Sequence, residues 1–192
     1  MMMKVACGHV IPFICLTAFG LLLPPLAEST TLAQLSLDQL VNSAHAVVRA
    51  KAISNERLWH DGEIWTVTTF LVIENWKGSS TPEIAVWMIG GQMGRIMSFV
   101  PGAPRFRPGE ETVLFLEPTR TGEMSITAWG EGTFRVHFDA RTGESFATQD
   151  TAIAPEYEPA THSFQHSGIR NWPLAVLKMR VLEATSAQGS TK

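Results

Sequence analysis

The sequence predicts a mainly β domain, a small antiparallel barrel with a short helix before it and another helix after it. Residues 45–76 contain two apolar, β-branched runs around an Asp61-Gly62 pair, which is typical of a β-hairpin. Further short apolar runs follow, and glycines and prolines separate them. The stretches 36–44 and 171–184 instead have the apolar spacing of helices.

The individual elements follow from local patterns. Ser36 and Gln39 form a capping box, which predicts a short helix to about Ala44. A final helix begins at Asn171, with an apolar stripe of Leu174, Leu177 and Val181. Between them we expect strands over residues 45–54, 63–76, 84–88, 112–116, 124–129 and 133–138. The side chains expected to face the core are Trp65, Val67, Leu71 and Ile73 in the second strand and Phe134, Val136 and Phe138 in the last.

The first 29 residues have the organisation of a secretory signal peptide. Lys4 precedes an apolar run over residues 10–23, and two small residues, Ala27 and Ser29, follow it. This run is shorter than the roughly 20 residues that a membrane span needs, and an uncleaved anchor is the alternative. We therefore expect a secreted or periplasmic protein with no membrane span after the signal peptide is removed.

The rest of the chain divides into a barrel domain over residues 30–147 and a polar linker with the C-terminal helix over residues 148–192. Both cysteines, Cys7 and Cys15, lie in the predicted signal peptide, so no disulfide is expected in the exported part. The net charge of the full sequence is −3. There is no basic excess to neutralise phosphates, so nucleic acid is not an expected partner.

The strand sequences also resemble a known family. Residues 46–54 (AVVRAKAIS) resemble the first strand of the tissue inhibitors of metalloproteinases, which have the netrin-like version of the OB-fold. Residues 65–73 resemble the long second strand, and Trp76-Lys77-Gly78 resembles the turn that ends it. Residues 83–89 and 109–116 are similar to the third and a later strand, and much the same pattern occurs in exported bacterial proteins.

This resemblance covers roughly residues 44–130 and implies an OB-like (netrin-like) barrel. The inhibitors act through an N-terminal cysteine whose amine and carbonyl chelate the zinc of the protease. No residue of the exported part matches that cysteine. The resemblance therefore carries over a fold and no functional residue.

The candidate binding segment is the loop from Gly91 to Glu111. A loop of about 20 residues in a compact domain is usually functional or mobile. Within it we assign partner binding to Arg95, Arg105, Phe106 and Arg107. The alternative is that the arginines pair with the neighbouring carboxylates, Glu110 and Glu111, and only order a turn. Phe106 is either a plug in the barrel end or an exposed anchor. We favour the plug, because a lone apolar residue in a polar loop usually pins that loop down.

Other candidate sites are weaker. His162 and His166 have a spacing that could hold a metal on a helix, but solvated linker histidines are the favoured interpretation. Of six tryptophans, Trp59 beside the hairpin turn is expected to be the most exposed. Gly-x-Ser-x-Gly and Gly-x-x-x-x-Gly-Lys motifs are absent. We expect no enzyme activity, no metal and no cofactor.

These observations predict an exported, non-enzymatic binding module for a protein partner in the cell envelope or exterior. The long loop and one face of the barrel would contact that partner. Two alternatives stay open: a metalloprotease inhibitor-like protein, and a hydrolase with an unrecognised site.

Overall fold

The structure is a computed structural model that describes residues 35–79, 81–152, 156–158, 163–165 and 168–189. All of them belong to one compact unit, residues 34–192. The signal peptide predicted over residues 1–29 lies outside the described residues. In the described part of the chain, no helix is long and apolar enough to cross a membrane.

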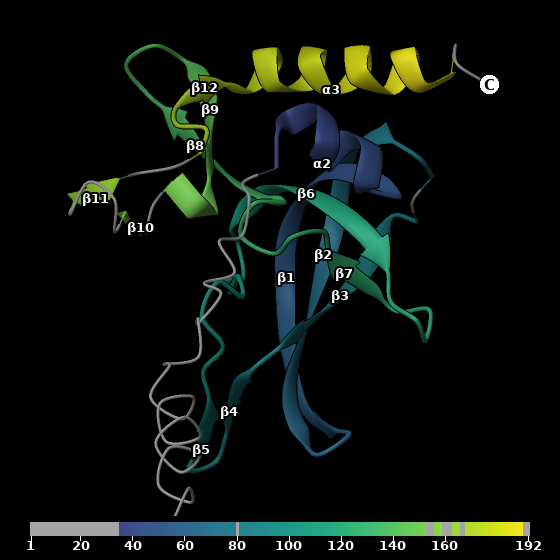
Figure 1. Cartoon of the computed structure of the whole chain (residues 1–192), viewed down its shortest axis with the longest axis vertical. Coiled ribbons are helices and arrows are strands. Elements are labelled where there is room, and N and C mark those ends of the chain that lie inside the picture. The colour runs from purple at the N-terminus through teal and green to yellow at the C-terminus, as the bar shows by residue number, and fades with distance from the viewer. Residues whose placement is uncertain (1–34, 80, 153–155, 159–162, 166–167, 190–192) are drawn as a thin grey trace, which may run out of the picture. The chain divides into compact units, whose positions relative to one another are not determined.

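The chain is mainly β, as the sequence predicts, with a short helix before the strands and a longer helix after them (Figure 1). A 3-10 turn, Asp150–Ala152, follows strand β9. In chain order the helices and strands are α2 (Leu37–Ser43), β1 (Ala46–His60), β2 (Glu63–Lys77), β3 (Glu83–Ile89), β4 (Gly91–Met93), β5 (Ile96–Ser98), β6 (Glu111–Pro118), β7 (Met124–Ile126), β8 (Thr133–Asp139), β9 (Glu144–Gln149), β10 (Glu156–Glu158), β11 (Ser163–Gln165), β12 (Trp172–Pro173) and α3 (Leu174–Gly189).

Five strands close on one another in the order β1-β2-β3-β7-β6, because β6 pairs back to the first half of β1. The ring has the least strand pairing between β3 and β7, which pair in parallel at Val86 and Met124 alone. The result is an OB-like ring rather than a fully hydrogen-bonded barrel. Strands β8, β9 and β12 extend the sheet from β6, so the C-terminal segment rejoins the barrel domain.

The long β1–β2 hairpin turns at Asp61-Gly62, as predicted. Both residues have positive φ, 50° and 80°, which is the backbone that a tight primed turn requires. Strand β6 pairs with β1 only as far as Lys51, so the second half of the hairpin projects beyond the ring. Trp59, next to this turn, is exposed, as expected.

The capping box at the start of α2 is also confirmed, since the Ser36 side chain accepts from Gln39 N and the Gln39 side chain accepts from Ser36 N. Two apolar cores lie on opposite sides of β1 and β6. One fills the ring and includes Phe70 and Phe106. The other lies between the sheet and the two helices and includes Phe115 and Phe134.

The face predicted for β2 is wrong. Ile64, Thr68 and Phe70 are buried, whereas Leu71 and Ile73 are exposed and Trp65 and Val67 are half-buried. Apolar residues occupy both faces of this strand, so alternation alone does not select one. A buried threonine on the core side is tolerated because Thr68 Oγ1 donates to Asn55 Oδ1 at 2.7 Å.

Phe138 is likewise exposed instead of buried, because β8 runs past the edge of the core, while Phe134 is fully buried. Two segments expected to be irregular contain strands. The predicted loop after β3 forms the β4–β5 pair, and the predicted linker contains the β10–β11 pair.

Candidate functional site

The candidate segment leaves β3 through two glycines that lie against β2. Gly90 N donates to Ile64 O at 2.7 Å, and Thr66 Oγ1 donates to Gly90 O at 2.7 Å. A Cβ atom on Gly91 would meet Thr66 Oγ1 at 2.6 Å, which is closer than real side chains approach. Only glycine allows the chain to pass this close to β2, so the start of the segment is fixed against the barrel.

The β4–β5 hairpin that follows carries large apolar side chains into solvent. Gly91 pairs with Ser98 and Met93 with Ile96, around a turn at Gly94-Arg95. The exposed fractions are 55% for Ile96, 63% for Met97 and 70% for Phe99. We call these three residues, with Arg95 and Arg105, the β4–β5 surface. An exposed apolar group of this kind is typical of a site that contacts another molecule.

Phe106 is the plug that the sequence favours. Its side chain is only 6% exposed and meets the Phe70 ring edge to face, with 4.9 Å between centroids. Asn55 Nδ2 donates to Phe106 O at 2.8 Å, so the backbone of this residue is also held. Because it is buried in the ring, Phe106 anchors the segment and does not itself present a contact surface.

Arg135 on β8, which sequence reasoning missed, clamps the segment from outside. Its guanidinium carbon lies 4.6 Å from the Phe106 ring centroid, and its Nη2 donates to Arg105 O at 2.8 Å. It also forms a two-pronged ion pair with Asp150 and a 2.7 Å ion pair with Glu110. Burial alone would lower the pKa of Arg135, but the hydrogen bonds and attraction of these carboxylates outweigh it and raise that pKa.

The predicted arginines occupy three different places. Arg105 lies beside Phe99, with its guanidinium 5.5 Å from that ring centroid, and donates to Ser98 O at 3.1 Å. Arg95 lies at the hairpin turn and Arg107 in the turn before β6; both are exposed. Within the described ranges, neither Arg95 nor Arg107 has a side-chain hydrogen bond or ion pair. Residues 91–109 contain these three arginines and no acidic residue.

A second polar cluster lies at the other end of the ring, beneath α3. Arg49 forms ion pairs with Glu74 and Glu111, at 2.7 and 2.6 Å, and Lys178 of α3 also pairs with Glu74. Hydrogen bonds from Lys178 and then Arg49 lower the pKa of Glu74 from 4.5 to about 2, against the opposing effect of burial. Each charge in this cluster has a partner of opposite sign. The cluster therefore helps to hold α3 against the sheet.

No group of three His, Cys, Asp or Glu side chains converges as a metal site in the part of the chain that the structure describes. His162 and His166 lie outside that part, so the structure does not bear on their spacing.

Neither a protein-family model nor a curated protein matches this sequence. The netrin-like resemblance therefore stays a prediction beyond the OB-like class of fold.

Proposed function

We propose that this protein is an exported, non-enzymatic binding module that holds a protein partner in the envelope or exterior through its β4–β5 surface. The observation that carries the proposal is the exposure of Ile96 and Met97 in β5 and of Phe99 just after it, each more than half open to solvent. Aromatic residues, methionine and arginine are the types enriched where proteins bind one another.

The contacts that hold the β4–β5 segment in place also support a role in binding. Phe106 anchors the segment inside the ring, and Arg135 holds it from outside through the Arg105 carbonyl. Exposed apolar side chains on a preorganised segment lose little conformational entropy on binding, which favours affinity.

The positive charge of the segment indicates the chemistry of the partner that would bind it. Arg95, Arg105 and Arg107 give residues 91–109 a charge of +3 in a chain whose net charge is −3. The two acidic residues that complete the segment, Glu110 and Glu111, pair with Arg135 and Arg49. We therefore expect a partner with an apolar depression for Phe99 and carboxylates around it. Opposite charge of this kind steers the encounter and suppresses wrong partners.

To test the proposal, the exported form of this protein is used as bait for envelope proteins. The proteins that it retains are then measured by quantitative mass spectrometry. A partner should be retained by the unchanged protein and lost by about tenfold or more with Phe99→Ala, as for a residue at the centre of an interface. Phe138→Ala is the matched control, because Phe138 is 66% exposed on β8 and lies outside the surface.

Equal retention by all three proteins would contradict the proposal. Assays against a panel of metalloproteases distinguish the inhibitor alternative from the binding module. Tight inhibition that is unchanged by Phe99→Ala would favour the inhibitor. Hydrolysis of ester or peptide substrates by the unchanged protein would favour the hydrolase alternative.

A further inference from the structure

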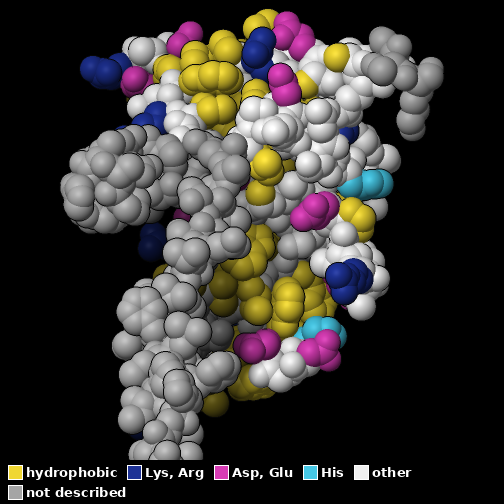
Figure 2. All heavy atoms as spheres, in the orientation of Figure 1, with side chains coloured by type: hydrophobic (Ala, Val, Ile, Leu, Met, Phe, Trp, Pro, Cys, Tyr) yellow, Lys and Arg dark blue, Asp and Glu magenta, His cyan; other side chains and the backbone are white. Residues whose placement is uncertain are grey.

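Helix α3 is apolar on two opposite sides, although only one of them packs on the protein. Leu174, Leu177 and Val181 are buried in the core beneath the helix. Met179 and Leu182, on the outer side, are 50% and 42% exposed. Figure 2 shows hydrophobic side chains among charged and polar ones along this helix. Exposed apolar side chains that lie together on a surface are typical of a contact with another molecule.

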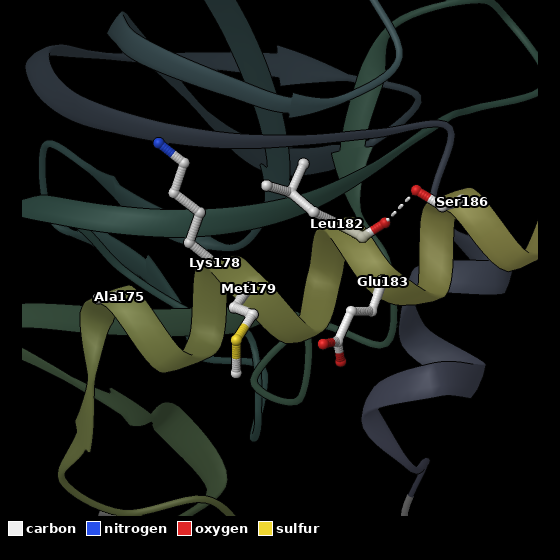
Figure 3. A pocket seen from close by; sticks show the side chains of 6 residues that line it. All are labelled: Ala175, Lys178, Met179, Leu182, Glu183 and Ser186. Atoms are coloured by element: carbon white, nitrogen blue, oxygen red, sulfur yellow. Dashed lines mark hydrogen bonds between the residues drawn. The ribbon is translucent and has the colours of Figure 1, made fainter.

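The outer side has the spacing of a two-helix seam. Ala175, Met179, Leu182 and Ser186 follow one another at intervals of four, three and four residues. They line a shallow open groove of about 620 Å³, together with Lys178 and Glu183 (Figure 3). Alternation of four and three is the pattern of a coiled-coil contact, with Met179 at an a position and Leu182 at a d position.

The charges that flank this seam are self-complementary. Lys178 immediately precedes Met179 and Glu183 immediately follows Leu182, which are the g and e positions. In a parallel helix pair, a g residue faces the e residue five positions later on the other helix. Lys178 of each copy would then face Glu183 of the other, and the two contacts would form symmetrically.

Both groups have an ion-pair partner within the chain, and both are exposed enough to make this contact as well. The Lys178 side chain is 45% exposed, and its ammonium donates one hydrogen bond to Glu74 Oε2 and carries three N–H groups. The Glu183 side chain is also open to solvent, with Arg180 Nη1 at 3.6 Å as an exposed neighbour. A carboxylate this exposed can turn toward a second copy.

We propose that α3 pairs in parallel with α3 of a second copy of this chain, with the Ala175–Ser186 seam at the centre of the contact. The helix has 16 residues, and its seam alone is smaller than the roughly 1,200–2,000 Å² of a standard interface. The dimer is therefore weak and concentration-dependent.

The first test is sedimentation equilibrium of the exported protein over about 1–500 μM, a range that covers weak association. The unchanged protein should dimerise, and Leu182→Glu should raise the dissociation constant by about tenfold or more. Leu71→Glu is the matched control, since Leu71 is 43% exposed on β2 and Leu182 42% exposed on α3. A monomer throughout this range, or equal weakening by both changes, would overturn the proposal.

The second test addresses orientation. Since the two cysteines lie within residues 1–29, a Leu182→Cys protein carries one thiol in its exported part. In a parallel pair the two d positions face each other, so oxidation should give a covalent dimer. Arg180→Cys, on the neighbouring side of the helix, should not. A crosslink that forms only when Met179→Cys and Leu182→Cys proteins are mixed would overturn the parallel arrangement.

Discussion

Replacing Phe106 by alanine tests whether the candidate surface depends on its anchor. The Phe106 ring fills the end of the strand ring against Phe70 and lies under the guanidinium of Arg135. Alanine keeps the backbone and its hydrogen bond from Asn55 but removes the whole ring. We expect the barrel to keep its fold, to lose stability, and to hold the β4–β5 segment less firmly.

The expected loss of stability follows from the burial of the Phe106 side chain. Truncating a buried phenylalanine to alanine typically costs about 3–5 kcal/mol, which includes the lost edge-to-face contact. Phe106 lies at the mouth of the ring, where the segment can move inward and fill part of the space. We therefore expect about 3 kcal/mol, the lower end of that range. Phe106→Leu should cost less, because it leaves more of the apolar volume in place.

The assay is urea unfolding followed by tryptophan fluorescence. The midpoint should fall by about 1–2 M with little change in slope. Phe99→Ala is the control, since Phe99 is exposed and its removal should change stability by less than about 0.5 kcal/mol. A loss below about 1 kcal/mol for Phe106→Ala, or equal losses for the two variants, would refute the plug.

Three further predictions concern other contacts. Lys178 holds the pKa of Glu74 at about 2, so the ionised carboxylate stabilises the fold above pH about 4.5, and this contribution is lost as pH falls toward 2. Glu74→Gln should therefore cost about 1 kcal/mol at pH 7 and much less at pH 2, as pH-dependent urea unfolding would show. Ser36→Ala should cost about 1 kcal/mol by removing the cap of α2, which thermal unfolding measures. Arg135→Met should cost about 2–3 kcal/mol by leaving Asp150 unpaired, and should speed proteolysis of the β4–β5 segment.

Features set by neighbouring residues could be predicted from the sequence. The Asp61-Gly62 turn and the Ser36 capping box each depend on a few adjacent side chains, and both form as expected. The plug also follows from local composition, because Phe106 is the apolar residue between two arginines and two prolines. Contacts across the fold leave no such local signal.

Strand β2 shows why its buried face could not be selected. Phe70 and Leu71 are adjacent and both apolar, and the alternation of β2 is compatible with either in the core. The face is decided by irregular pairing between β1 and β2 and by the Asn55 side chain, which accepts a hydrogen bond from buried Thr68. These partners lie 13 or more residues away along the chain.

Arg135 is the clearest case of a residue whose role depends on distant neighbours. Along β8 it occupies an outward position between Phe134 and Val136, which is typical of a solvated side chain. Its partners Glu110 and Asp150 are 25 and 15 residues away, and they meet it only because β6, β8 and β9 pair side by side. The candidate surface is therefore held by contacts that depend on the completed fold.

The positions of α3 and the β4–β5 hairpin allow the two proposals to be separated. Figure 1 shows α3 at one end of the barrel domain and the hairpin at the other. A dimer built on α3 would place its two β4–β5 surfaces far apart, so one small partner could not occupy both and gain avidity. Leu182→Glu should therefore weaken the dimer yet leave retention of the proposed envelope partner unchanged, measured by the same quantitative mass spectrometry. A partner lost with Leu182→Glu would show that binding requires the dimer, and would refute this independence.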